Sequence, residues 1–396
     1  MEPYMSEHNT KQRRLRLDVS VFETVMQSGN VAARMALTRQ LCDLLNAPGS
    51  DSEECREAIP VIAKLACDVD NNIRAIIADK LIATQGLSAD LIFAIVADED
   101  DIAIPFVALN PSIDDTIMQA ILAVGNLERC KAVAERRDVG PGAVRKIIKD
   151  GREEIVVALL GNENVRLGPG YCRKIYNRFH SSPKVCAILM DLPNLPSVIA
   201  LVHNQRLAED MRKAGQYQGW VADFRSDDCI SDEEEVNALR ILRGVDARQL
   251  QPTVALMSQR GMLTTSLLLR SGMTGDLPFF EHALAYLANV SLRKVRRATG
   301  TMSERTVRTL LRRAGVPDDA HVIIRAICQV SAATGATGKH ADSDAFGRAL
   351  VEVIMTRHAA DDEHERSRII GILSQLTQGP TRTLVSRLSE GISRVA

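Results

Sequence analysis

The sequence predicts an all-α fold, in which a solenoid of short helix pairs is followed by a second helical region. Three observations predict it. Aromatic residues make up only 4% of the 396-residue chain, which is low for a β-sandwich or barrel. Apolar residues recur at helical spacing in short stretches from about residue 57 to 205. A peptide that opens a helix also recurs after 28 residues, a period typical of stacked helical repeats.

Each short stretch carries one apolar face, with its residues three or four positions apart. The gaps between the stretches are too short for domain linkers, so we interpret each stretch as one helix of a stack. The residues expected in the core are Ile59, Ile62, Leu65, Ile73, Ile76, Ile77, Leu81, Leu91, Ile92, Ile95, Val96, Ile117, Ala120, Ile121, Val124, Val144, Ile147, Ile148, Ile155, Val156, Leu159, Leu160, Val185, Ile188 and Leu189.

The clearest repeated peptide is GPGAVRKI at 140–147, which returns as GPGYCRKI at 168–175. Pro141 and Pro169 suit the first position of a helix, where the missing N–H needs no partner, and Pro196 continues the series. The glycine before each of the first two prolines permits a sharp entry into the helix. A phosphate-binding P-loop would need a preceding strand and the pattern GxxxxGK[ST], and neither is present. We therefore interpret these glycines as structural residues at repeat boundaries.

The stretch LACDVDNNIRAIIADKL at 65–81 resembles the turn between the two helices of a HEAT repeat. That pattern places an aspartate in the turn, here Asp68, and an arginine early in the second helix, here Arg74. A bond between these two side chains would tie neighbouring turns together. The next copy, VADEDDIAIPFVAL at 96–109, keeps the acids but has Ile104 in place of the arginine.

Longer segments resemble a bacterial family without an assigned function. They are DVDNNIRAIIADKL, ADEDDIAIPFVALNPSIDDTIM, AVAERRDVG and VVALLGNENVRL, within about 30–215, and a weaker match lies near 283–317. Through them the chain is similar to the domain-of-unknown-function family two-three-three-six, HEAT-like helical-repeat proteins found mainly in alphaproteobacteria. No catalytic residues are established for that family, so the resemblance implies a fold and no active site.

Shifts in composition divide the chain into five expected parts: 1–50, an N-terminal tail and helices; 51–215, the HEAT-like array; 216–235, an acidic connection; 236–330, a second helical region; and 331–396, a linker and C-terminal helices. In the acidic connection, Ser231 and Glu234 have the spacing of a capping box for the next helix. Three final helices are expected to bury Phe346, Leu350, Ile354, Ile369, Ile372, Leu376, Leu384, Leu388 and Ile392.

Several classes of protein are disfavoured. A net charge of −1 provides no overall attraction to nucleic acid or membrane. No apolar run is long enough to span a membrane, and the N-terminus lacks the apolar core of a signal peptide. The eight cysteines include no CxxC pair and fall mostly in apolar helical patterns, so we expect free thiols in a reducing cytoplasm.

The sequence contains no recognisable hydrolytic, redox or metal-binding signature. The closest histidines, His358 and His364, are six residues apart and would lie on different faces of a helix. We therefore expect no enzyme activity, cofactor, metal or small-molecule substrate. An enzyme built on helical repeats, such as a base-excision glycosylase, would need an aromatic cleft with a buried acid, for which Trp220 beside Asp223 is the candidate.

Charge is distributed unevenly along the array. Residues 51–115 hold fourteen acids against four bases, and residues 129–184 hold thirteen bases against six acids. Stacked repeats align equivalent positions, so basic pairs on consecutive units would form a ridge that accepts an acidic protein segment or a phosphate-bearing ligand. The alternative is a solvated surface on which basic side chains cover apolar groups. The ridge residues are Arg145, Lys146, Arg173 and Lys174, extended by Arg136, Arg137, Lys149, Arg152 and Arg178.

A second basic cluster lies in 291–317, where MSERTVRTLLRRAG looks like the recognition helix of a helix-turn-helix. Its arginines Arg305, Arg308 and Arg312 share one helical face. The turn before this helix fits the motif poorly, because an arginine falls where the first helix needs a small packed residue. An ordinary helical hairpin is the competing interpretation.

The expected function follows from these observations. Helical-repeat arrays present long surfaces and rarely catalyse a reaction without an added site. We expect a cytoplasmic, non-enzymatic adaptor or scaffold that binds a protein partner and acts in regulation or signalling. The alternative is a nucleic-acid-binding protein that uses the ridge or the segment 291–314.

Overall fold

The computed structural model has a helical fold. It describes residues 22, 24–26, 29–47, 53–217, 224–301, 303–334, 343–357 and 363–376, and every regular element in these ranges is a helix. The predicted all-α class is therefore confirmed. The chain divides into two compact units, Met1–Leu195 and Pro196–Ala396. Among the described residues, no helix has the length and apolar character needed to cross a membrane.

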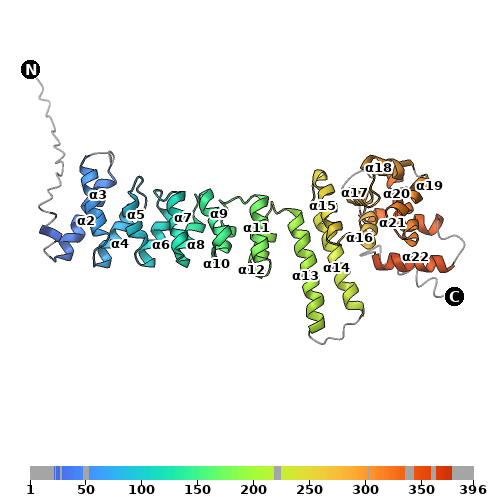
Figure 1. The fold of residues 1–396 in the computed structure, drawn as a ribbon, viewed down its shortest axis with the longest axis horizontal. Coiled ribbons are helices and arrows are strands. Elements are labelled where there is room, and N and C mark those ends of the chain that lie inside the picture. The colour runs from blue at the N-terminus through green and yellow to red at the C-terminus, as the bar shows by residue number, and fades with distance from the viewer. Residues whose placement is uncertain are drawn as a thin grey trace, which may run out of the picture. The chain divides into compact units, whose positions relative to one another are not determined.

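The first unit is a stack of short helix pairs in two rows (Figure 1). The even-numbered row contains α2 (Val31–Leu45), α4 (Asn71–Leu81), α6 (Asp100–Leu109), α8 (Leu127–Glu135), α10 (Glu153–Gly161) and α12 (Pro183–Met190). The odd-numbered row contains α3 (Glu53–Leu65), α5 (Ala89–Val96), α7 (Asp115–Val124), α9 (Pro141–Asp150) and α11 (Pro169–Phe179). Each helix of the even-numbered row packs against the next one in that row, and α9 packs against both α7 and α11. This is the predicted solenoid.

Short polar residues and prolines start the helices of the array. Asp70, Asp114 and Asn126 each accept a hydrogen bond from a backbone N–H in the first turn of the following helix. Pro141 and Pro169 occupy the first turns of α9 and α11, as predicted. The helices of the odd-numbered row begin every 26 to 28 residues, at Asp115, Pro141 and Pro169, and each interval must hold two helices. The helices are therefore short.

The predicted apolar faces form the core of the array. Most of the expected residues are buried, including Ile73, Ile121, Ile147 and Leu159. Val124 is an exception, because its side chain is 81% exposed. It is the last residue of α7 and precedes Gly125, whose left-handed backbone conformation turns the chain away from the packed face.

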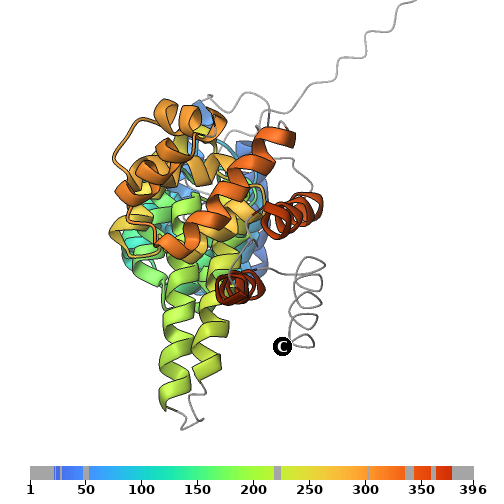
Figure 2. The same cartoon turned by 90° about the vertical axis from the view of Figure 1, so that its right-hand side faces the viewer.

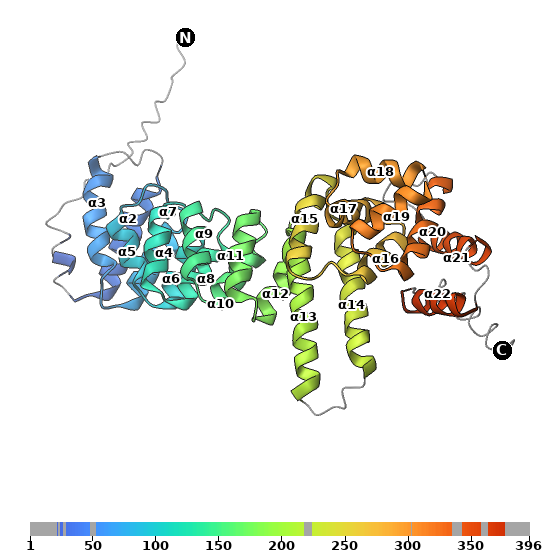
Figure 3. The ribbon, with the colours of Figure 1, turned by 45° about the vertical axis from the view of Figure 1, so that its right-hand side comes forward.

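The second unit is also helical. Its elements are α13 (Ser197–Tyr217), α14 (Phe224–Arg243), α15 (Ala247–Gln259), α16 (Thr265–Met273), α17 (Leu277–Leu287), α18 (Leu292–Thr301), α19 (Glu304–Arg313), α20 (Asp318–Thr334), α21 (Ser343–Arg357) and α22 (Glu363–Leu376). Helices α13 and α14 form a long hairpin, which is seen from two directions in Figures 2 and 3. Helix α16 packs against α17, α20, α21 and α22, and so lies at the centre of the remaining helices.

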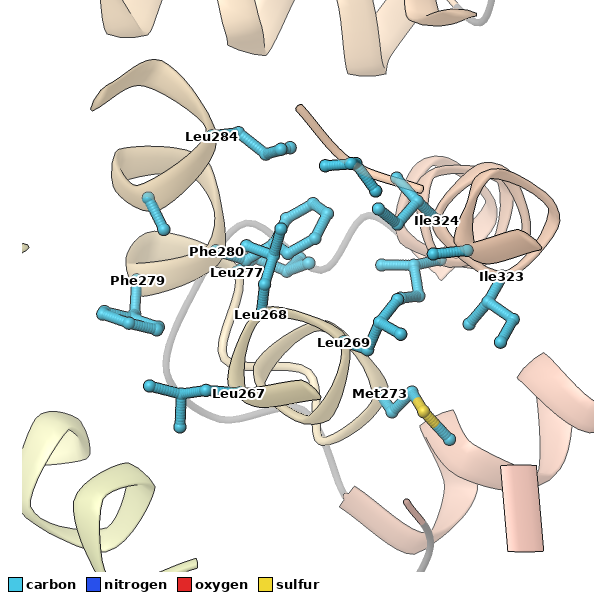
Figure 4. Close-up of a cluster of buried hydrophobic side chains, with 14 of the residues drawn as sticks. Leu267, Leu268, Leu269, Met273, Leu277, Phe279, Phe280, Leu284, Ile323 and Ile324 are labelled. Carbon is cyan, nitrogen blue, oxygen red and sulfur yellow. The ribbon is translucent and has the colours of Figure 1, made fainter. Parts of the chain in front are cut away.

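Helices α16, α17 and α20 meet in the core of the second unit (Figure 4). Leu268 of α16, Phe280 of α17 and Ile324 of α20 are almost fully buried there. A side chain on Gly272 would overlap Ile327 and press against Phe280, so this glycine allows α16 to approach its neighbours closely.

The boundary between the units differs from the predicted one. The array was expected to continue to residue 215, but the first unit ends at Leu195. Pro196 does not open another short repeat helix, because the helix after it, α13, is 21 residues long and pairs with α14. A proline marks the beginning of a helix and carries no information about its length.

The predicted acidic connection is helical where the structure describes it. Residues 224–235 lie inside α14, so Ser231 and Glu234 are interior residues of a helix and do not form a capping box. The acids there pair with neighbouring helices: Glu234 bonds Arg212 of α13, and Glu235 and Asp232 bond Arg270 of α16. Arg270 is only 3% exposed, so these acids neutralise a buried cation.

The C-terminal helices agree with the prediction as far as they are described. Phe346, Leu350 and Ile354 are buried in α21, and Ile369 and Leu376 are buried in α22, whereas Ile372 is only partly buried. The third predicted helix, with Leu384, Leu388 and Ile392, lies outside the described residues. Trp220, Asp223 and His358 also lie outside them.

Candidate partner-binding surface of the repeat array

The residues of the predicted ridge fall into two groups. Arg136 and Arg178 belong to the first group, and their side chains are held by the protein itself. Arg136 is 3% exposed and donates hydrogen bonds to the backbone carbonyls of Val107 and Asn110, as well as to the carboxylate of Asp138. The prediction that Arg136 is a surface contact is therefore wrong.

Arg178 has a related structural role. Its guanidinium donates hydrogen bonds to the carbonyls of Ile148 (2.6 Å) and Gly151 (2.9 Å), at the C-terminal end of α9. It also lies over the ring of Phe179, at 4.6 Å from the ring centre. These bonds satisfy carbonyls that a helix end leaves without partners, so Arg178 fastens α11 to α9.

The second group remains a candidate surface. Arg145 and Lys146 of α9 stand 28 positions before Arg173 and Lys174 of α11, and the two helices pack against each other (Figure 1). Three of these side chains are exposed and Lys146 is half-buried. None of the four makes an ion pair or a side-chain hydrogen bond with another described residue, although Lys174 lies 6.0 Å from the ring centre of Tyr171. We call these four residues the basic strip.

Further cations surround the basic strip. Arg137, Lys149, Arg152 and Arg166 are all exposed, and their side chains likewise have no ion pair among the described residues. Arg137 precedes α9 and Arg166 precedes α11, whereas Lys149 and Arg152 lie near the C-terminal end of α9. The sequence did not identify Arg166 as a candidate, because it falls in a loop outside the repeated RKI peptide at 145–147 and 173–175.

A cavity of about 230 Å³ lies between the beginnings of α9 and α11. Arg137, Val139, Pro141 and Val144 line it from the α9 side, and Arg166 and Tyr171 line it from the α11 side. Its wall thus combines two cations with apolar surface. Both arginines are exposed, so the cavity is accessible from solvent.

The two GPG peptides, at 140–142 and 168–170, differ in what they contact. In the first copy, the carboxylate of Asp115 accepts hydrogen bonds from the backbone N–H groups of Gly142 (3.0 Å) and Ala143 (2.8 Å). A side chain at Gly140 or Gly142 would overlap that carboxylate. In the second copy, a side chain at Gly168 or Gly170 would meet no described atom within 4 Å. The glycines of the first copy are therefore structural, as predicted, and those of the second copy leave open space.

Three polar residues that the sequence analysis missed link the even-numbered row. Asn110, Arg136 and Asn162 each directly follow a helix of that row, at intervals of 26 residues, and all three are buried. Each donates hydrogen bonds to two carbonyls, one in the last turn of the preceding helix of the row and one just beyond that helix. We call these residues the C-terminal ladder. Their regular spacing was the sequence signal that could have identified them.

The bond predicted between Asp68 and Arg74 takes another form. Arg74 donates to the backbone carbonyl of Asp68 (2.8 Å) and pairs with the carboxylate of Asp98 in the next turn (2.8 Å). The carboxylate of Asp68 pairs instead with Arg34 of α2, at 3.1 Å. The next repeat has Ile104 where an arginine was expected, and Arg129 of α8 takes that role. Arg129 pairs with Asp100 and donates hydrogen bonds to the carbonyls of Val96 and Asp98, in the turn before α6.

The second predicted basic cluster lies on α18 and α19. Arg305, Arg308 and Arg312 are exposed on one face of α19, and Val307, Leu310 and Leu311 are buried on the opposite face. Arg308 pairs with Glu304 at 2.7 Å, and Arg312 lies 3.9 Å from Asp318. Two of the three arginines therefore have acidic neighbours, in contrast to the basic strip.

The stacked pairs of short helices define a helical-repeat protein. The chain belongs to a bacterial family described as "Uncharacterised protein conserved in bacteria (DUF2336)", whose family model matches residues 102–364. The match begins in α6 and ends at the beginning of α22, so it includes the basic strip and most of the second unit. No curated protein and no solved structure matches the chain.

Proposed function

We propose that this protein is a cytoplasmic, non-enzymatic adaptor or scaffold that binds an acidic segment of a partner protein on the basic strip. The observation that carries the proposal is the repetition of exposed basic side chains, without internal counter-ions among the described residues, on the packed helices α9 and α11. Such side chains attract an anionic partner and lose no internal ion pair when it binds. A regulatory or signalling role is the wider context that we propose for this binding.

The free state of the cysteines supports the cytoplasmic part of the proposal. All eight are free thiols, and six of them are buried. Free thiols persist in a reducing compartment, whereas an oxidising compartment favours disulfides.

The charge of the surrounding array favours a short acidic segment over a long nucleic acid. The basic strip occupies only two neighbouring helices of the odd-numbered row, and the earlier part of the same unit, residues 51–115, carries ten more acids than bases. A duplex that continued along the array would meet this negative part, which repels phosphates. A peptide of a few residues can remain within the basic strip.

The test is a binding measurement with defined probes. A fluorescent peptide of about twelve residues, made of aspartate and glutamate with one central leucine, is titrated with the full chain at low salt. We expect the variant R145E/K146E/R173E/K174E to bind this acidic peptide at least about tenfold more weakly, because each reversal replaces an attraction by a repulsion. Affinity should also fall as salt is added.

A matched variant controls for total charge. R293E/K294E/R305E/R312E makes the same change of charge on exposed residues of α18 and α19, and we expect it to bind the acidic peptide as the wild type does. Equal weakening of both variants, or no binding by the wild type, would contradict the proposal. A duplex of about 20 base pairs is the second probe. Tight, steeply salt-dependent duplex binding that is lost in the α18–α19 variant would favour the nucleic-acid alternative.

A further inference from the structure

The first GPG peptide shows how this motif binds a carboxylate. Asp115, at the first position of α7, places both carboxylate oxygens against the N–H groups of Gly142 and Ala143 in the first turn of α9. The amides at the beginning of a helix have no partner within the helix and carry partial positive charge, so they stabilise an anion. Gly140 and Gly142 leave the room that the carboxylate needs.

The second GPG peptide has no such carboxylate among the described residues. The repeat offset of 28 makes Gly170 and Tyr171 the counterparts of Gly142 and Ala143. The residue that corresponds to Asp115 is Pro141, because each is the first residue of its helix. A proline ring carries no hydrogen-bond acceptor, so the side chain of Pro141 cannot accept hydrogen bonds from the first turn of α11 as Asp115 does from that of α9.

The cavity described above lies between Pro141 and the first turn of α11. Pro141 and Tyr171 both line it, and the space of about 230 Å³ beside them is bordered by Arg137 and Arg166. Neither arginine has an ion-pair partner among the described residues. The cavity therefore combines two guanidinium groups with Tyr171 in the first turn of α11, and Gly168 and Gly170 leave open space beside that turn.

We propose that this cavity receives an aspartate or glutamate side chain of the partner's acidic segment, as the first GPG peptide receives Asp115. This inference rests on the proposed function and specifies one of its contacts. Val139 and Val144 give the wall an apolar part, so the residue next to the bound acid is expected to be apolar. The basic strip holds the remaining acids of the segment. The partner is thus a protein segment in which an acid stands beside an apolar residue.

A substitution that fills the cavity from within tests the proposal. Pro141→Asp would place a carboxylate at the position equivalent to Asp115, where it can accept a hydrogen bond from the Gly170 amide. The Tyr171 amide already donates to the carbonyl of Gly168 (2.9 Å). We expect it to weaken binding of the acidic peptide at least about tenfold without lowering the melting temperature. The matched control is Pro183→Asp, which makes the same change at the exposed first residue of α12, away from the cavity, and should leave the affinity unchanged.

Two further variants separate occupation of the cavity from a simple effect of charge. Pro141→Asn supplies a neutral acceptor, and R137A/R166A removes the two guanidinium groups. We expect both to weaken binding, and the amide resonances of Gly170 and Tyr171 to shift when the acidic peptide is added to the wild type. If only Pro141→Asp weakens binding, its charge alone accounts for the effect and the proposal is overturned.

The proposed function and this inference can fail separately. If R145E/K146E/R173E/K174E loses the acidic peptide while the Pro141 variants and R137A/R166A bind it normally, the basic strip binds the partner and the cavity does not. If the wild type does not bind the acidic peptide, both proposals are overturned.

Discussion

The acidic and the basic parts of the repeat array use their charged residues differently. In residues 51–115, many acids are engaged within the chain: Asp68 and Asp98 pair with arginines, and Asp70 and Asp114 cap helices. Among residues 129–184, the basic strip has no comparable partners in the described structure. The acids lie in the turns between helices, whereas the basic strip lies on outward faces. Position relative to a helix end therefore separates a structural charge from a surface charge.

The same distinction divides the arginines of the basic part. Arg136 and Arg178 bond backbone carbonyls at helix ends, whereas Arg145 and Arg173 extend from the middle of helices. A count of basic residues treats these four alike. The first two bond the stack internally, although Arg178 is also exposed, whereas the last two have no ion pair or side-chain hydrogen bond among the described residues.

The largest expected effect is that of Arg136→Met. This variant leaves the buried carbonyls of Val107 and Asn110 without their arginine, and we expect the free energy of unfolding to fall by about 3 kcal/mol. Urea unfolding, followed by the helical circular dichroism signal, measures this change. The control, Arg145→Met, should change stability by less than about 0.5 kcal/mol. Similar effects of the two substitutions would remove the distinction between structural and surface arginines.

A somewhat smaller effect is expected for Asn162→Ala in the C-terminal ladder. The Asn162 amide donates to the carbonyls of Ala134 (2.9 Å) and Arg136 (2.6 Å), and both bonds are buried. Their loss should reduce the free energy of unfolding by about 2 kcal/mol in the same urea experiment. Asn177→Ala, at an exposed position of α11, is the comparison and should be nearly neutral. A neutral Asn162→Ala would mean that the C-terminal ladder contributes little to stacking.

Much of the fold was predictable because it depends on local signals. Helix beginnings at Pro141 and Pro169, and buried residues such as Ile147 and Leu159, follow from capping chemistry and periodicity. Arg136 could not be assigned in this way. Its role depends on carbonyls of α6 about 26 to 29 residues earlier, and its charge alone suggested the surface.

The candidate site was predictable only in part. The repeated RKI peptide identified the exposed basic residues, because stacking places equivalent positions side by side. The cavity beside Pro141 depends on loops and on the absence of a carboxylate that is present one repeat earlier. The end of the array near Pro196 was also missed, since α13 begins with the same signal as the short helices and differs from them in length.

Glycine-to-alanine substitutions in the two GPG peptides are expected to change the stability of the protein in opposite directions. In Gly142→Ala, the added methyl group would displace Asp115 and Gln119, so we expect a loss of about 1 to 2 kcal/mol as the carboxylate loses its amide partners. In Gly170→Ala, the methyl group meets no described atom within 4 Å, and the higher helix propensity of alanine should stabilise the protein by up to about 1 kcal/mol. Melting temperatures of the two variants measure the difference. Destabilisation by both would show that the second GPG peptide is as tightly packed as the first.

The smallest expected effect concerns the cysteines of the two parts. Cys67 is exposed beside the acidic turn at Asp68, whereas Cys130 and Cys172 are buried in the basic part, where burial raises the pKa of both thiols. Because the thiolate is the reactive form, iodoacetamide at mildly alkaline pH should modify Cys67 and leave the other two almost untouched in the folded protein. Mass spectrometry of the digested protein measures the modification at each site. Alkylation of Cys67 should leave acidic-peptide affinity and melting temperature unchanged, because this thiol is remote in the array from the basic strip. Equally fast modification of Cys130 or Cys172 would mean that α8 or α11 opens readily, and that the basic part is held together less firmly than the bonds of Arg136 and Arg178 indicate.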